Sequence, residues 1–157
     1  MFSQRDKDSI SIRSYQSGDE TVLSAMIQAA LRQVNSKDYK PAIIEKMCEK
    51  FTPERIKEFS AKRKMFVAIN AEQIVGTISL IKDTIFTVFV DPTRHHQGIG
   101  TQLMKYIEGV AKQDGYSSVV VPASVTAHDW YKNLGYQDVK MTTSEEHGTN
   151  FVMSKNL

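Results

Sequence analysis

The first part of the chain shows one strand-like pattern followed by helical patterns. Residues 9–15 alternate isoleucines with polar neighbours, a period that is typical of a half-buried strand. Residues 19–34 repeat apolar side chains at helical spacing, which predicts a helix. Two more helices are predicted to begin at Pro41 and Pro53, because proline suits the first turn of a helix.

The middle of the chain predicts three strands and a long helix. Strand patterns at 64–69, 73–81 and 84–90 are separated by short turns, which is typical of an antiparallel meander. A single apolar face then repeats at helical spacing from Gly100 to Gly115, where the second glycine is expected to end the helix.

The last part of the chain predicts three strands and a short helix. Residues 118–121 are β-branched and almost free of polar side chains, so we expect a central strand that is covered on both faces. A short helix is expected at 126–134. Two final strands are expected at 136–140 and 150–153, joined by the polar stretch 142–148.

The order of these elements predicts the fold class. The long helix links the strand at 84–90 to the strand at 118–121, which makes the two strands a parallel crossover. The other links suit antiparallel pairs. We therefore predict an α/β (α+β) fold with a mixed, mostly antiparallel sheet and flanking helices, forming a single domain over residues 1–157.

Composition restricts the classes of function. The chain of 157 residues has a formal net charge of +2, which gives no reason to expect binding to nucleic acid or to an anionic membrane. Cys48, the one cysteine, excludes an internal disulfide, and its place in a predicted helix indicates an inert, buried thiol. Residues 1–8 do not resemble a signal peptide and no apolar run has membrane-spanning length, so we expect a cytoplasmic protein.

The segment 88–101 carries the strongest signal for a binding site. A β-branched run ends at Pro92, basic residues follow, and Gly98 and Gly100 precede the predicted helix. Backbone N–H groups at a helix N-terminus have no partner inside the helix, and glycines let an anion approach the backbone closely. The segment is therefore predicted to hold a phosphate group.

Two common phosphate-binding motifs do not fit this segment. The Rossmann fingerprint needs a third small residue three positions after the second glycine, where this chain has Leu103. The P-loop needs Gly-Lys followed by Ser or Thr, a sequence that the chain lacks. The residues thus exclude both nucleotide-binding interpretations.

What remains resembles the Gcn5-related N-acetyltransferase (GNAT) superfamily. Its signature is Gln/Arg-x-x-Gly-x-Gly/Ala between a strand and a helix, and residues 95–100 match it with His95 in the first position. A second segment, with Ala127, Tyr131 and Gly135 at intervals of four, is similar to the family's Ala-x-x-x-Tyr-x-x-x-Gly-Phe/Tyr motif. The two motifs stand in the family's order and spacing.

The resemblance implies transfer of an acetyl group from acetyl-coenzyme A to an amine acceptor, either a small molecule or a peptide. In the family, the backbone of the strand before the loop holds the pantetheine arm, and the loop holds the pyrophosphate. Whether Arg94 or His95 assists the phosphates stays open, as does whether Ser124 contacts the coenzyme or caps the next helix. The implied coenzyme-binding residues are Val88, Phe89, Val90, His95, His96, Gln97, Gly98, Ile99, Gly100, Thr101 and Ser124.

Tyr131 matches the family's usual general acid. A phenol with an ordinary pKa of about 10 is protonated at neutral pH and can donate to the departing thiolate, whose pKa is about 8.5. The general base stays open, because residues 85–90 contain no carboxylate. A water chain or an already neutral amine explains the chemistry equally well, and neither His128 nor Asp129 is assigned.

The remaining expectations concern other ligands and partners. The adjacent His95 and His96 have no further ligand beside them, so no metal site is expected. Helices between residues 19 and 63 are expected to form much of the acceptor wall, with Tyr39 either in this wall or at the surface. Trp130 is expected in the core or in the pocket wall. The alternative function is a non-catalytic acyl-coenzyme A sensor or partner-binding module. Many relatives form homodimers, although nothing in this sequence specifies an interface.

Overall fold

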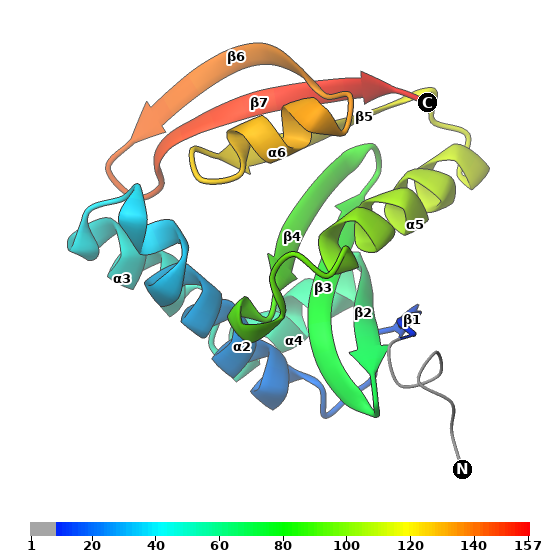
Figure 1. The fold of residues 1–157 in the computed structure, drawn as a ribbon, viewed down its shortest axis with the longest axis horizontal. Helices are drawn as coiled ribbons and strands as arrows, with labels where there is room; N and C mark the ends of the chain where they lie inside the picture. Colours follow the sequence, from blue (N-terminus) through cyan, green and yellow to red (C-terminus); the bar gives the residue numbers. More distant parts are fainter. Residues whose placement is uncertain (1–8) are drawn as a thin grey trace.

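The computed structural model describes residues 9–157, whose strands form one seven-stranded sheet (Figure 1). The strands are β1 (Ser11–Ser14), β2 (Lys64–Asn70), β3 (Gln73–Ile81), β4 (Thr84–Val90), β5 (Ser118–Ser124), β6 (Gln137–Ser144) and β7 (Gly148–Asn156). They lie in the order β1-β2-β3-β4-β5-β7-β6, and β4–β5 is the parallel pair. The predicted crossover within a mostly antiparallel sheet is confirmed.

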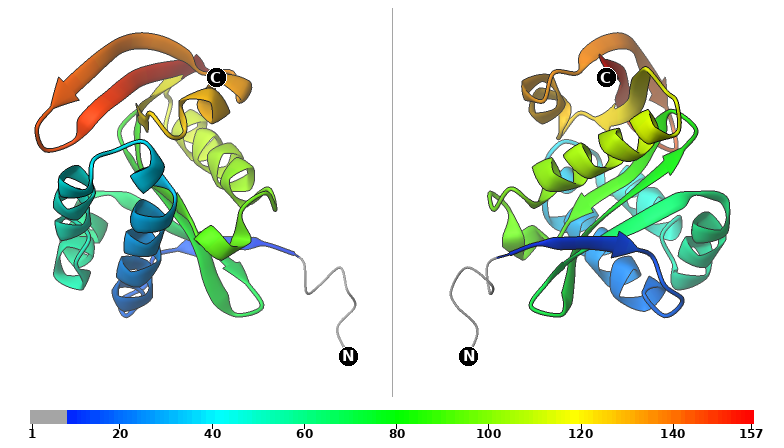
Figure 2. Two further views of the ribbon diagram at one scale, coloured as in Figure 1. Left: turned by 60° about the vertical axis from the view of Figure 1, so that its left-hand side comes forward. Right: turned by 90° about the vertical axis from the view of Figure 1, so that its right-hand side faces the viewer.

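Helices cover both faces of this sheet. They are α2 (Glu20–Gln33), α3 (Pro41–Glu49), α4 (Pro53–Lys62), α5 (Ile99–Gln113) and α6 (His128–Asn133), with the short 3-10 turns η1 (Asn35–Lys37) and η2 (Pro92–Arg94). α2, α3 and α4 lie on one face and α5 on the other (Figure 2). Pro41 and Pro53 start their helices as predicted, and the Thr52 hydroxyl accepts a hydrogen bond from the Arg55 N–H at 3.3 Å to cap α4.

The alternation along β2 explains how the two faces pack. Met65 and Val67 are buried with the helices α2, α3 and α4, whereas Phe66 and Ala68 are buried with α5. Each side chain of this size that is fully buried contributes roughly 1.5–3 kcal/mol to folding. The sheet therefore separates two apolar clusters, and its middle strands are fixed in position by both.

The sheet divides between β4 and β5. These strands share one backbone register, Thr84 opposite Val120, and the Val120 N–H donates to the Asp83 carbonyl at 2.9 Å. Beyond this point β4 pairs with β3, and β5 pairs with β7. Within residues 9–157, the edge of β4 that faces β5 is therefore left without a neighbouring strand over most of its length.

Two expectations about the last strands are wrong. The polar stretch 142–148 is not a long connection but part of a hairpin, because β6 continues to Ser144 and β7 starts at Gly148. Every residue of β6 is exposed since β6 is an edge strand, so its polar side chains do not oppose strand formation. The strand β5 is also not covered on both faces, because buried positions alternate with partly buried or exposed ones such as Pro122.

Two further expectations can be placed on the structure. Cys48 is buried as predicted, and burial raises the pKa of its thiol. None of the described helices is long and apolar enough to cross a membrane. The expectation about a signal peptide concerns residues 1–8, which lie outside the described residues.

Candidate active site

A cleft of about 1410 Å³ lies where β4 and β5 diverge. Its walls come from α2, α3, α4, β4, the loop before α5, β5, α6 and the β6–β7 hairpin. The structure brings every residue that the sequence predicts for the site to this one cavity. These residues are Val88, Phe89, Val90, His95, His96, Gln97, Gly98, Ile99, Gly100, Thr101, Ser124 and Tyr131.

The loop between β4 and α5 presents a row of backbone N–H groups. Those of residues 95–101 donate to no other group of residues 9–157, and the first helical bond runs from the Gln102 N–H to the Gly98 carbonyl at 3.1 Å. Gly98 has a φ of +78°, which glycine adopts without strain, and no atom lies within 4 Å of the place where its Cβ would be. The N-terminus of α5 is thus open to an anion.

The structure separates the surroundings of Arg94 from those of the two histidines. Arg94 donates to Asn70 Oδ1 at 2.8 Å and to Gln73 Oε1 at 3.4 Å, which ties its side chain to the β2–β3 hairpin. The rings of His95 and His96 are exposed, with their centroids 6.2 Å apart. Arg94 also lines the cleft, but these hydrogen bonds hold it against the hairpin, whereas the side chains of His95 and His96 form no hydrogen bond or ion pair within residues 9–157.

A β-bulge bends β4 along the cleft. The β3–β4 register shifts between Thr77 and Ser79, and Thr87 has a φ of +57°, which is rare for a β-branched residue. The Thr87 hydroxyl lies 2.9 Å from Ser79 Oγ and accepts a hydrogen bond from Arg63 Nη1 at 2.9 Å. These two contacts hold the bulge. No local sequence pattern predicts the contact between Arg63 and Thr87.

Tyr131 stands on α6 with its ring enclosed and 4% of the residue exposed. The ring lies edge-on to Trp130, with the centroids 4.9 Å apart, and to Tyr136 at 5.7 Å. Burial raises the pKa of the Tyr131 phenol above its ordinary value, and its hydroxyl forms no hydrogen bond with residues 9–157. A neutral phenol beside the cleft can donate a proton. Trp130 lines the cleft, as expected for a pocket wall.

Two hydroxyl groups at the end of β5 behave differently. Ser124 Oγ accepts a hydrogen bond from the Ala127 N–H at 3.1 Å in the turn that precedes α6, whereas the N-cap of α6 is Ala127 and has no side-chain cap. Thr126 Oγ1 is the one buried side-chain N or O atom of the described chain without a hydrogen-bond partner. Leaving such a group unpaired costs about 1–3 kcal/mol. Because Thr126 also lines the cleft, a polar ligand atom there would be stabilised, and the sequence did not single this residue out.

Tyr39 and His128 are both engaged by other parts of the fold. The Tyr39 hydroxyl accepts a hydrogen bond from the Val125 N–H at 2.9 Å and donates to the Thr149 carbonyl at 2.8 Å, so this side chain is buried and not at the surface. His128 Nε2 lies 2.7 Å from Asp138 Oδ1. Neither Tyr39 nor His128 lines the cleft.

Acidic side chains are scarce among the described residues that line the cleft. Glu146 is the one carboxylate among its described lining residues, and it is exposed and lies 3.6 Å from Lys50 Nζ. No group of three or more His, Cys, Asp or Glu residues in the described chain is arranged to hold a metal ion. Three histidines also line the cleft: His95 and His96 in the loop before α5, and His147, whose Nε2 lies 2.7 Å from Lys50 Nζ.

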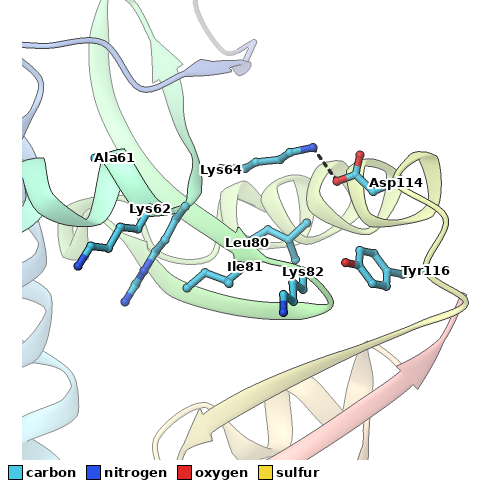
Figure 3. Close-up of a pocket in the computed structure, with 9 residues that line it drawn as sticks. Ala61, Lys62, Lys64, Leu80, Ile81, Lys82, Asp114 and Tyr116 are labelled. Carbon is cyan, nitrogen blue, oxygen red and sulfur yellow. Dashed lines mark hydrogen bonds and ion pairs between the residues drawn. The ribbon is translucent and has the colours of Figure 1, made fainter.

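A second, smaller hollow of about 560 Å³ contains no predicted site residue (Figure 3). Lys62, Lys64, Lys82 and Tyr116 are among the residues around it. Lys64 Nζ is paired with Asp114 Oδ2 at 2.6 Å, across from Leu80 and Ile81. The larger cleft is therefore the candidate site.

Comparison with known proteins identifies the family. The family model of the acetyltransferase (GNAT) domain matches residues 35–157. The chain belongs to the GNAT acetyltransferases. A related GNAT protein, the uncharacterized N-acetyltransferase YafP of Escherichia coli (strain K12), is 36% identical over 149 residues, covering 93% of this chain and 95% of YafP.

Solved GNAT structures share the fold. A GCN5-related N-acetyltransferase from Rhodopseudomonas palustris matches with a TM-score of 0.90 at 23% identity, over 95% of this chain and 96% of the other. The PaiA N-acetyltransferase of Thermoplasma acidophilum, solved in complex with coenzyme A, matches with a TM-score of 0.79 at 19% identity, over 95% and 99% of the two chains. The GNAT fold predicted from the two sequence motifs is confirmed.

Proposed function

We propose that this GNAT protein transfers an acetyl group from acetyl-coenzyme A to an amine acceptor, with Tyr131 as the general acid. One observation carries the proposal: the N–H row of residues 95–101 and the Tyr131 side chain line the same cleft. The first suits a pyrophosphate and the second suits protonation of a departing thiolate. The coenzyme A bound to PaiA from Thermoplasma acidophilum supports the choice of donor.

The cleft provides groups that match acetyl-coenzyme A along its length. The backbone of Val88 to Val90 has no strand on its β5 side, so it can pair with an extended pantetheine arm. The unpartnered Thr126 hydroxyl offers one further hydrogen bond. The volume of about 1410 Å³ exceeds the roughly 300–1,000 Å³ of ordinary ligand pockets, which leaves room for an acceptor beside the donor.

The chemistry follows from these groups. Acetyl-coenzyme A, when bound, supplies an acetyl thioester that a neutral amine can attack. The backbone of β4 next to the Thr87 bulge is assigned to orient the thioester carbonyl and to stabilise the negative charge that develops on its oxygen. Tyr131 is assigned to give its phenolic proton to the sulfur that leaves, after which the acetylated nitrogen loses its extra proton to water and the phenolate regains a proton from water.

No side chain is assigned as the general base. Within residues 9–157, the one carboxylate lining the cleft is Glu146, which is exposed. An amine with a lysine-like pKa of about 10.4 must lose a proton before it attacks. We propose that the proton goes to water, or that the neutral fraction of the amine is captured.

The test is release of the coenzyme A thiol across a panel of amines, for the native protein and for Tyr131→Phe. General acid catalysis contributes about 10²–10⁴-fold, so kcat should fall by at least about 100-fold, while coenzyme A affinity stays unchanged in calorimetry. Tyr106→Phe is the matched control, because Tyr106 is 39% exposed on α5 and does not line the cleft.

Each outcome separates the two candidate functions. Thiol release that depends on an amine and on the Tyr131 hydroxyl supports the enzyme with this acid. Thiol release at the native rate in Tyr131→Phe contradicts the role of Tyr131. Tight binding of acetyl-coenzyme A without turnover of any amine favours the non-catalytic sensor, a role consistent with the lack of an assigned base.

A further inference from the structure

One end of the cleft is lined by aromatic rings from α4, β4 and the turn after α3. Phe51 packs edge-on against Phe59, with the ring centroids 6.0 Å apart, and against Phe89 at 5.5 Å. All three residues line the cleft and are partly buried. This wall suits an apolar body of about the size of one ring.

Two arginines stand against this wall without an anionic partner. The Arg63 guanidinium carbon lies 4.3 Å from the ring centroid of Phe59 and 4.9 Å from that of Phe86. The Arg55 guanidinium carbon lies 6.0 Å from the same Phe59 ring. Within residues 9–157, no carboxylate forms an ion pair with Arg55 or with Arg63.

Two other arginines, Arg13 and Arg32, do have carboxylate partners. Arg13 is paired with Asp19 at 2.8 Å, and Arg32 with Glu45 at 3.1 Å. Arg63 is half-buried, and its one side-chain hydrogen bond within residues 9–157 uses Nη1, which donates to Thr87. Partial burial of an unpaired cation is costly, and it lowers the pKa of this guanidinium. An anion in the cleft would remove that cost.

This anion is not the pyrophosphate of the donor. The phosphate loop follows the C-terminal end of β4, whereas Arg63 contacts Phe86 and Thr87 nearer to the strand's beginning. Thr87 precedes the end of β4 by three residues, which is about 10 Å along a strand. Arg63 and the phosphate loop therefore meet different parts of β4, with the segment 88–90, assigned to the pantetheine arm, between them.

We propose that Arg63, with Arg55 beside it, binds a carboxylate group of the amine acceptor, whose apolar body packs against Phe51, Phe59 and Phe89. The acceptor class is then an amine that also carries a carboxylate and a ring-sized apolar group, as in an aromatic amino acid. This inference rests on the proposed acetyl transfer, which it extends by naming the acceptor. Arg63 suits a carboxylate because its planar guanidinium can donate two parallel hydrogen bonds.

The experiment compares phenylalanine with phenylalaninamide, which lacks the carboxylate. Binding is measured by calorimetry in the presence of coenzyme A, and kcat/KM by thiol release, for the native protein, Arg63→Gln and Arg55→Gln. A charge-assisted hydrogen bond contributes enough that Arg63→Gln should weaken phenylalanine about 10- to 100-fold more than phenylalaninamide, whose own loss reports the effect on the Thr87 bulge. Arg55 is exposed, so Arg55→Gln should weaken phenylalanine by up to about fivefold.

Lys62→Gln is the matched control. It removes one positive charge from the end of α4, outside the large cleft, and should change neither acceptor by more than about twofold. Because each variant is compared with the native protein for each acceptor, the different basicities of the two amines cancel. Coenzyme A affinity and thermal unfolding of Arg63→Gln report whether the Thr87 bulge has been disturbed.

The outcomes separate this proposal from the proposed function. An equal loss for phenylalanine and phenylalaninamide in Arg63→Gln overturns the carboxylate site and assigns Arg63 to the bulge alone. Failure of the native protein to bind phenylalanine in calorimetry also overturns it. Carboxylate-dependent binding without any thiol release supports the site and counts against acetyl transfer. If the protein acetylates phenylalanine and phenylalaninamide with equal kcat/KM, acetyl transfer is supported and the carboxylate site is contradicted.

Discussion

A Cβ atom placed on Gly100 would lie 2.9 Å from Cζ2 of Trp130, closer than side-chain carbons approach in proteins. Gly100 is in the first turn of α5 and Trp130 is on α6. The two helices can approach this closely because Gly100 has no side chain. At Gly98 no described atom lies within 4 Å of the Cβ position, so a side chain would fit. Glycine is favoured there by its backbone conformation, a φ of +78°.

Gly100→Ala and Gly98→Ala should therefore act in different ways. Gly100→Ala forces the Trp130 ring to shift where it lines the cleft, and an overpacking cost of about 1–3 kcal/mol that falls on the coenzyme-bound state corresponds to roughly 5- to 150-fold weaker coenzyme A binding. Gly98→Ala should cost about 1–2 kcal/mol of stability through left-handed strain. Calorimetry and thermal unfolding measure the two effects. Unchanged coenzyme A affinity in Gly100→Ala would argue against close packing of Trp130 on the binding site.

The pH dependence of turnover tests the state of Tyr131. Burial raises the pKa of this phenol, so it stays protonated at and above pH 10, the ordinary pKa of tyrosine. The rate should rise with pH as the acceptor amine loses its proton, and loss of the acid should cause no decline below about pH 10. A kcat profile from pH 6 to 10 checks this. A descending limb near pH 8–9 that disappears in Tyr131→Phe would contradict the raised pKa.

Glu20 is predicted to make folding stability depend on acid pH. The Tyr15 hydroxyl donates to this carboxylate at 2.5 Å and the Gly18 N–H at 2.8 Å, with Lys57 Nζ at 3.4 Å, and together they lower its pKa to about 2. Because the folded-state pKa lies below the unfolded one, this stabilisation is present above pH 4.5 and is lost as the pH falls toward 2.

Thermal unfolding between pH 2 and pH 7 measures this contribution. Glu20→Gln should unfold at a lower temperature than the native protein at neutral pH, and the difference should shrink on acidification. Glu58→Gln is the control, since Glu58 is exposed on α4 and forms no ion pair within the described chain. If Glu20→Gln and Glu58→Gln show the same dependence, the Tyr15 contact does not stabilise the fold.

Tyr39→Phe is predicted to destabilise the protein without touching the cleft directly. The lost hydroxyl leaves the Val125 N–H and the Thr149 carbonyl without their partner, which costs about 1–3 kcal/mol. Urea unfolding measures the change, and Tyr106→Phe at an exposed position should cost much less. Equal stability of the two variants would show that water replaces the Tyr39 hydroxyl.

The parts of the site that the sequence predicts are those in which one short segment carries the whole pattern. Residues 95–101 show their role locally, because the glycines and the following helix are adjacent in the chain. Tyr131 is found through its spacing from Gly135. Such motifs need no knowledge of what packs against them.

Contacts between distant segments could not be predicted from the sequence. Arg63 reaches Thr87 across 24 positions, and Tyr39 reaches Thr149 across 110, with no local signal at either end. The stretch 142–148 was expected to be a connection because it is polar, yet polarity there reflects the position of β6 at the edge of the sheet. Polar residues indicate exposure to water, and an exposed edge strand meets that condition as well as a loop does.

The two parts of the sheet, β1–β4 and β5–β7, are joined by a single backbone register, Thr84 opposite Val120. Beyond that register, α5 packs against apolar side chains from both parts of the sheet, and this packing holds the two parts at a fixed separation. A ligand that contacts both β4 and the β5 side joins the two parts of the sheet, so its concentration contributes to the stability of the folded state. A ligand present at 100 times its dissociation constant adds about 2.7 kcal/mol to the folded state. The midpoint temperature of unfolding should therefore rise as such a ligand is added.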